Sequence, residues 1–366
     1  MPRELHLSVA LDGTGHHSVD TGPATSLTAA HGADLIGLAE QAALDFVTVG
    51  DSLAPPPHDS ADRLDSVAVL AGVAPLTSRI GLIPTVTTTH TEPFHASTAL
   101  ATLDFVSEGR AGWLIDVSSS EAEALAVGHR GVAPAAELWA EAASAAEVAV
   151  RLWDSGEGDA EIRDAATGRF IDCERLPDIG FEGPHFSVRG PSIVPRPPQG
   201  RPPIVVALDV HDSDGQWELA ARHADVVLLD AEQPTVARLA RAALLSRTAE
   251  AGRDPDALRV LVRVAVDLGG GAGSLPPADT VRFSGAAADL GDLLADWHGA
   301  GGADGFHLLP ASVPADLPAV VHDLVPTLRA RGLFRADYTG HTLRDHLGLA
   351  HPDDVRSDGP SERAVS

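Results

Sequence analysis

The 366-residue chain contains no lysine, and it has one methionine, one tyrosine and one cysteine. The absence of lysine excludes Schiff-base chemistry, a P-loop lysine and a carbamylated-lysine metal bridge. The lone Cys173 forms neither an intrachain disulfide nor a zinc cluster, which is typical of a reducing cytoplasm, and we expect it to be an inert buried thiol. Catalysis therefore falls to His, Asp, Glu, Arg, Ser or Thr side chains, or to a bound cofactor.

Basic residues and long apolar runs are scarce as well. The chain has 26 basic against 52 acidic residues, which gives a net charge of −26. A surface this negative repels nucleic acid and anionic membranes, so we expect neither as a partner. No apolar run approaches the roughly 18 residues of a membrane helix, and the first ten residues lack the apolar stretch of a signal peptide. These features predict a soluble, cytoplasmic protein.

Short apolar runs alternate with amphipathic stretches along the whole chain. Several of these runs are unbroken rather than alternating, which is typical of parallel strands covered on both faces. The strands are predicted at Leu5–Leu11, Phe46–Val49, Ile80–Pro84, Trp113–Ile115, Ile204–Leu208, Val226–Leu229, Leu258–Val266 and Phe306–Leu309. Helices are predicted at Ala33–Leu44, Asp62–Leu76, Glu92–Glu108, Ala135–Trp153, Gly215–Ala224, Thr235–Ala251, Ala286–Gly299 and Leu317–Ala330.

Eight strands, each followed by a helix, predict a closed (β/α)8 barrel. An open doubly wound sheet would need a glycine fingerprint after the first strand, and that segment lacks a third glycine. We expect residues 1–350 to form one domain, with an insertion at 154–201 between the fourth helix and the fifth strand. This insertion is too long for a simple connection, and its turn signals suggest a hairpin. Residues 351–366 are expected to be a disordered tail.

The active site of such a barrel lies at the carboxyl ends of its strands. Aspartates follow many of the predicted strands, at Asp12, Asp51, Asp116, Asp209, Asp230 and Asp267. This ring raises the alternative of a metal hydrolase, but no His-x-His pair follows the first strand and no lysine is present to bridge two metals. Since Asp suits turns in any acidic chain, we predict no metal site.

Two other strand ends carry candidate residues. Thr87, Thr88, Thr89 and His90 leave the third strand just before a helix that Thr91 is placed to cap, so some of them should face the barrel opening. His90 either handles protons or points to solvent, and Asp51 either accepts a hydrogen bond from a bound heterocycle or caps its loop. Residues 212–215 open the helix after the fifth strand, where backbone N–H groups favour phosphate but the acidic side chains repel it.

Several segments resemble one family. Thr91–His95 and residues 101–113 look like the third-helix signature of bacterial luciferase-like flavin monooxygenases, nearest the nitrilotriacetate monooxygenase branch. The end of the fourth helix at 152–155, the segments 183–191 and 198–202, and the stretches 331–338 and 342–349 resemble the same branch in the same order.

The resemblance implies a luciferase-like TIM barrel that binds reduced FMN (FMNH2), supplied by a separate flavin reductase. The reduced flavin reacts with O2 to a C4a-peroxyflavin that oxygenates a small organic substrate, and the protein is expected to be a homodimer. Some relatives use the deazaflavin F420 for hydride transfer. On this resemblance His90 is the catalytic candidate. The candidate cofactor-binding residues are Asp51, Thr87, Thr88 and Ser118 at the isoalloxazine, and Ala207, Asp209 and Ser213 near the phosphate.

The chain also departs from the family pattern. Leu114 stands where the branch usually has Asn, and the expected Arg-Tyr pair falls near Leu138-Trp139. The Gln-Ala-Gly-x-Ser phosphate loop is replaced by residues 206–210, Val-Ala-Leu-Asp-Val. Three outcomes stay open: weak or altered FMN binding, the use of F420, and a catalytically silent paralogue that acts as a subunit. The substrate and the dimer interface are not set by the sequence alone.

Overall fold

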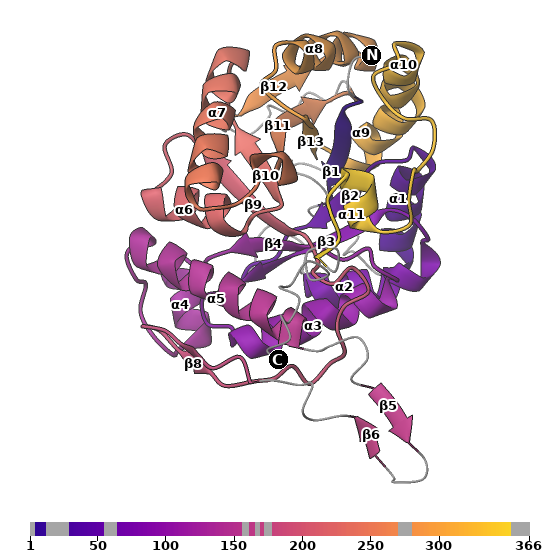
Figure 1. Cartoon of the computed structure of the whole chain (residues 1–366). Coiled ribbons are helices and arrows are strands. Elements are labelled where there is room, and N and C mark those ends of the chain that lie inside the picture. Colours follow the sequence, from indigo (N-terminus) through magenta and orange to yellow (C-terminus); the bar gives the residue numbers. More distant parts are fainter. Residues whose placement is uncertain are drawn as a thin grey trace, which may run out of the picture.

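Eight parallel strands form a closed barrel in the computed structural model, which describes residues 4–11, 29–54, 64–155, 178–269 and 280–352 and the backbone of 161–164 and 169–171. Counted in the ring order given next, the sixth strand pairs with the seventh and the eighth pairs with the first, so the ring is closed (Figure 1). In ring order the strands are β1 (His6–Ala10), β2 (Phe46–Val49), β3 (Gly81–Thr87), β4 (Trp113–Asp116), β9 (Ile204–Asp209), β10 (Val226–Asp230), β11 (Arg259–Asp267) and β13 (Gly305–Pro310).

Helices surround this ring and follow the predicted order (Figure 1). They are α1 (Ala29–Gln41), α2 (Ser66–Val73), α3 (Pro93–Val106), α4 (Glu121–Val127), α5 (Ala135–Ser155), α6 (Asp214–His223), α7 (Pro234–Glu250), α8 (Ala287–Gly299), α9 (Val313–Ala319), α10 (Val325–Ala330) and α11 (Leu343–Leu347). The described residues also form single turns, η1 (Ala74–Leu76) and η3 (Pro255–Ala257), and a π-helical turn, η4 (Val320–Leu324).

All eight predicted strands and all eight predicted helices are present, so the barrel prediction is confirmed. The prediction missed α4, α11 and the short strand β12 (Val281–Ser284), which pairs with β11 outside the ring. Thr91 does not cap α3 as predicted, because the helix begins at Pro93 and its N-cap is Glu92, whose side chain accepts no capping hydrogen bond.

The barrel interior is built in layers. Below its middle, apolar side chains from six strands meet α11, which closes the amino-terminal end of the barrel through Leu343, Leu347 and the following Leu349. Near the carboxyl end a smaller cluster joins Ala10, Ala265, Leu309 and Ala311. Because strand side chains alternate in direction, the opposite faces pack against the helices in the main core. Three of the four residues in this upper layer are alanines. We call the carboxyl ends of the ring strands, just above this layer, the mouth.

The predicted insertion contains hairpins. Backbone pairing joins β5 (Glu161–Asp164) to β6 (Arg169–Ile171) and β7 (Phe181–Glu182) to β8 (Ser187–Val188), in two sheets separate from the barrel (Figure 1). Cys173, Asp12 and the predicted tail beyond Pro352 lie outside the described residues.

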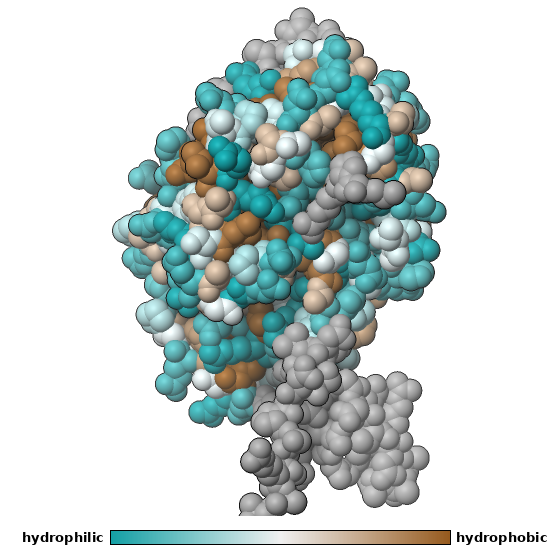
Figure 2. Space-filling model, turned by 45° about the horizontal axis from the view of Figure 1, so that its top comes forward, coloured by the Kyte–Doolittle hydropathy of each residue, from teal (hydrophilic) through white to brown (hydrophobic). Residues whose placement is uncertain are grey.

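Most of the face drawn in Figure 2 is hydrophilic, with apolar residues exposed in small separate groups. In the part of the chain that the structure describes, no helix combines the length and apolar character needed to cross a membrane.

Candidate active site

One wall of the mouth is lined by hydroxyl groups from the ends of β3 and β4. The Thr87 and Ser118 hydroxyls lie 3.1 Å apart, and the Thr88 hydroxyl donates to the Asp116 carbonyl at 3.2 Å. The Ser118 N–H donates to the Thr89 hydroxyl at 3.1 Å, so the two strand ends are tied together. Parallel pairing of Thr87 with Asp116 sets this arrangement. Three residues predicted separately therefore form one polar wall: Thr87, Thr88 and Ser118.

Asp51 organises the neighbouring loop after β2. Its carboxylate accepts hydrogen bonds from the Ser52 N–H at 2.7 Å and from the Ser66 N–H at the start of α2 at 3.0 Å. The Ser66 hydroxyl in turn donates to the Thr85 carbonyl at 2.8 Å, which links the loop to β3. The structure thus gives Asp51 the loop-fixing role that was one of its two predicted alternatives, while its position at the mouth keeps the other role open.

Glu123 is a buried site residue that the sequence reasoning missed. Its carboxylate accepts hydrogen bonds from the Ser52 hydroxyl at 2.9 Å and from the Ser120 hydroxyl at 2.9 Å. Ser120 and Glu123 also form a capping box at the start of α4. Although burial raises the pKa of Glu123, hydrogen bonds from Ser120 and Ser52 outweigh it and hold the pKa below its usual value. The Ser-x-x-Glu spacing after β4 was the readable signal.

His90 combines a strained backbone with a ring nitrogen whose hydrogen-bonding capacity is not used. Its φ is 66°, in the left-handed region that non-glycine residues rarely adopt, and its buried Nδ1 has no hydrogen-bond partner among the described residues. Burial, and after it the charge of Arg130, lowers the pKa of the imidazole, while Glu141 acts in the opposite direction. Arg130 and Glu141 form an ion pair with each other. The ring is therefore a neutral imidazole at pH 7 with one nitrogen free to accept or donate a proton.

The loop from β9 to α6 is acidic. One oxygen of the Asp209 carboxylate accepts from the His211 N–H at 2.7 Å, while its buried Oδ2 has no hydrogen-bond partner in the part of the chain that the structure describes. The Asp209 N–H donates to the Asp212 carboxylate at 2.6 Å. Ser213 is the N-cap of α6 and accepts from the Gln216 N–H, and the Gln216 side chain donates to the Ala207 carbonyl at 2.8 Å. Several N–H groups of the loop therefore already donate within it, to the carboxylates of Asp209 and Asp212 and to the Ser213 hydroxyl.

A charged row crosses the barrel interior beneath this loop. Asp209 pairs in register with Asp230, whose carboxylate lies 2.9 Å from Arg263. Arg263 is in register with His307, and His307 in turn with Ser8, whose hydroxyl lies 2.9 Å from Nδ1 of the ring. Burial and the nearby Arg263 lower the pKa of His307 to about 3, so it is neutral. Burial raises the pKa of Asp230, and Arg263 opposes this. Sequence reasoning placed Arg263 inside a strand without a role.

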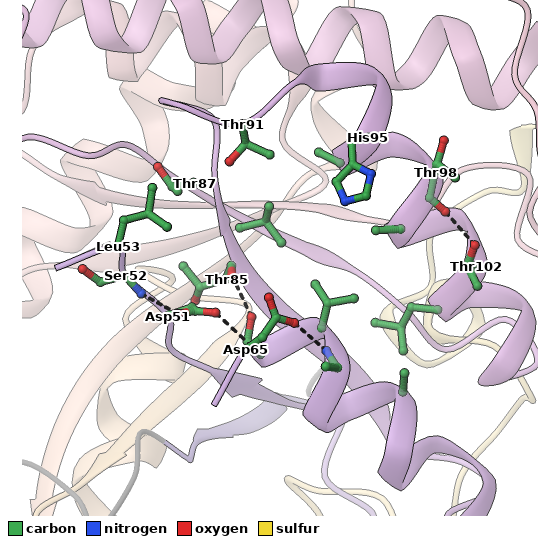
Figure 3. A pocket seen from close by; sticks show the side chains of 18 residues that line it. Asp51, Ser52, Leu53, Asp65, Thr85, Thr87, Thr91, His95, Thr98 and Thr102 are labelled. Carbon is green, nitrogen blue, oxygen red and sulfur yellow. Dashed lines mark hydrogen bonds between the residues drawn. The ribbon is translucent and has the colours of Figure 1, made fainter. Parts of the chain in front are cut away.

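A cavity of about 500 Å³ opens beside the mouth between α2 and α3 (Figure 3), and we call it the α2–α3 cavity. Asp51 and Thr87 are the two predicted site residues that line it. Its other walls are mostly alanine, valine and threonine side chains, and His95 of α3 projects toward it (Figure 3). A space of this size and apolar character is typical of small-molecule sites.

The predicted residues thus fall into two groups at the mouth. Asp51, Thr87, Thr88, Ser118 and His90 follow β2, β3 and β4, and Ala207, Asp209 and Ser213 lie at β9 and its loop. Among the residues that the structure describes, no group of three or more His, Cys, Asp or Glu side chains is placed to hold a metal ion.

The family is decided by comparison with known proteins. Residues 10–269 match the model of the luciferase-like monooxygenases. This chain belongs to the luciferase-like monooxygenase family. It is 31% identical to nitrilotriacetate monooxygenase component A of Aminobacter aminovorans, over 87% of this chain and 90% of that protein. It is 29% identical to N-acetyl-S-(2-succino)cysteine monooxygenase of Bacillus subtilis, over 96% of this chain and 98% of the relative.

A solved structure agrees with the fold. The EDTA monooxygenase from Chelativorans sp. BNC1 superposes with a TM-score of 0.83 at 22% identity, covering 95% of this chain and 99% of that one. The predictions of the family, of the barrel and of a monooxygenase-type oxidoreductase are confirmed.

The residues at the mouth fit the two ends of a flavin mononucleotide unequally. At β3 and β4 the hydroxyl wall and the unpartnered His90 Nδ1 suit the polar edge of an isoalloxazine. At β9 the unpartnered Oδ2 of Asp209 and the neighbouring Asp212 place negative charge where a phosphate would lie. The ring end therefore fits, and the acidic loop makes binding of the phosphate end less favourable.

Proposed function

We propose that the protein is an FMNH2-dependent monooxygenase that uses O2 to oxygenate a small organic substrate. The observation that carries the proposal is His90, because a strained backbone and an unpartnered buried ring nitrogen at a barrel mouth are typical of a functional residue. Family membership supplies the reaction class. Reduced flavin activates O2 for transfer of one oxygen atom, and the protein supplies orientation and the exclusion of water.

The proposed roles follow the two groups of residues. Asp51, Thr87, Thr88 and Ser118 line the isoalloxazine, and His90 holds or moves a proton beside it. Three residues lie near the ribityl phosphate: Ala207, Asp209 and Ser213. The α2–α3 cavity supports a small substrate bound next to Thr87.

The proposal includes partners. A separate flavin reductase supplies the reduced cofactor, and the name of one relative, component A of a monooxygenase, supports a system of more than one protein. We further propose a homodimer, and we keep the expectation of a cytoplasmic location from the single cysteine.

The test is oxygenation in a coupled assay. The purified chain is incubated with a flavin reductase, NADH, FMN, ¹⁸O₂ and a panel of small thioethers, amines, sulfones and alkanes, and products are analysed by mass spectrometry. One ¹⁸O atom in a product is expected, and a His90→Gln variant should lose the product while it still binds flavin. If the chain binds flavin but oxygenates no compound of the panel, the result favours the second candidate function described below. If the chain binds no flavin, the result contradicts the proposal.

The acidic phosphate end favours a second candidate, a catalytically silent paralogue that works as a subunit. The negative charges of Asp209 and Asp212 weaken the binding of the FMN phosphate. They weaken the binding of F420 further, because its oligoglutamate tail adds negative charge. Co-purification with a catalytic homologue, together with no turnover alone, would support this candidate.

A further inference from the structure

A second pocket lies at the opposite end of the barrel from the mouth. It has a volume of about 380 Å³ and is bounded by Ile204 at the start of β9 and by Asp225 just before β10. We call it the arginine pocket, because its walls carry four arginines and two histidines: Arg201, Arg222, Arg253, Arg344, His223 and His351. Asp225 is the one carboxylate among its lining residues. This is the reverse of the whole chain, where acidic residues outnumber basic ones two to one.

Two of these arginines are committed to the fold. Arg344 is buried and donates to the carbonyls of Arg201 and Ala350, and its guanidinium lies 3.3 Å from Asp225. Arg201 forms a two-pronged ion pair with Asp154 at the end of α5. These contacts hold the walls of the pocket in place, and they use up its nearest carboxylates.

Arg253 is different, because it lacks a carboxylate partner among the described residues. Its guanidinium donates to two backbone carbonyls at the end of α6, those of Ala221 at 3.1 Å and Ala224 at 2.8 Å. Burial lowers its pKa, Asp225 opposes this, and Arg344 and Arg201 lower it further. A partly buried cation that is surrounded by other cations is costly unless an anion balances it.

His223 faces the same charges. Its side chain is half-buried and makes no hydrogen bond, ion pair or ring contact within the described part of the chain. Burial and the charges of Arg253 and Arg222 lower its pKa to about 4, although Glu147 and Asp225 oppose them. Arg222 pairs with Glu218 on the exposed side of α6 and still lines the pocket. An unused imidazole and an uncompensated guanidinium therefore point into one concave space.

We propose that the arginine pocket binds a small oxyanion, either a phosphate group or a carboxylate-bearing metabolite, between Arg253, Arg222 and His223. Guanidinium groups bind both anions through paired N–H donors, and the pocket is large enough for a di- or tricarboxylate or for a pyrophosphate. The site lies on the amino-terminal face and is independent of the flavin and of oxygenation. Because the arginine pocket lies far from the mouth, a bound anion there would regulate or anchor the protein and would not take part in catalysis.

The experiment is isothermal titration calorimetry of the full chain with inorganic phosphate, pyrophosphate and citrate at constant ionic strength. We expect saturable binding of at least one anion at one site per chain. Tighter binding of the phosphates would assign a phosphorylated ligand, and tighter binding of citrate a polycarboxylate. Arg253→Gln should weaken the affinity by about tenfold or more, and Arg222→Gln by a few fold. The control Arg331→Gln removes a guanidinium that pairs with Asp292 elsewhere and should change nothing.

A further variant separates binding from folding, because Arg253 also bonds the end of α6. His223→Glu places a carboxylate among the arginines, so it should abolish anion binding and raise the melting temperature of the ligand-free chain. The absence of saturable heat with all three anions would overturn the proposal. So would anion binding that survives unchanged in His223→Glu and in a folded Arg253→Gln, since the anion would then lie at another site.

Discussion

Replacing Asp209 by Asn tests whether the acidic loop after β9 weakens the binding of the flavin phosphate. Asn preserves the side-chain oxygen that accepts the His211 N–H, and it puts a neutral amide in place of the buried, unpartnered Oδ2. If a separation of about 7 Å and an effective dielectric constant of about 40 are assumed, a carboxylate and a phosphate of charge near −1.5 repel by about 2 kcal/mol. Removing that repulsion should lower the Kd for FMN by roughly thirtyfold.

Riboflavin serves as the internal comparison, since it has the ring and the ribityl chain but no phosphate. Kd values for reduced FMN and reduced riboflavin are measured by anaerobic fluorescence titration of the wild type and of Asp209→Asn. The wild type should prefer FMN by less than about tenfold, and the variant should gain affinity for FMN alone. Asp214→Asn is the matched control, because that side chain is 95% exposed and its charge is screened by solvent. Equal gains for both flavins, or no gain for FMN, would refute the reasoning.

Three other changes test the account. His90→Gly removes the imidazole and the left-handed strain together, so turnover should fall about 10²-fold or more while the melting temperature does not fall. Asp45→Asn leaves Arg335 without its buried partner and should cost about 3 kcal/mol in urea unfolding at pH 7. Ser120→Ala removes the cap of α4 and one bond to Glu123, which should cost about 1 kcal/mol in the same assay.

The pH dependence of the Asp45→Asn effect follows from its environment. Burial raises the pKa of Asp45, but Arg335 and His6 outweigh it and hold the pKa well below the usual value. A lowered pKa in the folded state stabilises the fold above the unfolded-state pKa of about 3.9, and this stabilisation is lost as the pH falls below it. The difference in the free energy of unfolding between wild type and variant should therefore decrease as the pH falls from 4 to 2. A constant difference would contradict the assignment.

The ring of strands could be predicted from the sequence because each strand is a short apolar run with its own turn signals. Phe46–Val49 was placed to the residue. The missed α11 is five residues long and is held by tertiary contacts of Leu343 and Leu347, which a local pattern does not report. The predicted cap of α3 at Thr91 was wrong by one position, because Glu92 is the N-cap and Pro93 is the first helical residue.

The site was predictable only in outline. Strand ends in a barrel must meet at the mouth, so listing the polar residues after each strand found Thr87 and Ser118 as neighbours. Contacts between distant segments were not accessible in this way. The pair of Arg263 with Asp230 depends on strand register, and the arginine pocket gathers arginines and histidines from positions 201 to 351 that no motif links.

The central claim is that the mouth binds reduced flavin, and anaerobic titration of the chain with photoreduced FMN tests it most directly. The account predicts saturable binding of reduced FMN at one site per chain, weaker binding of oxidised FMN, and weaker binding still of F420. Preference for F420 would move the chemistry to hydride transfer. No binding of any of the three at micromolar concentrations would contradict the claim.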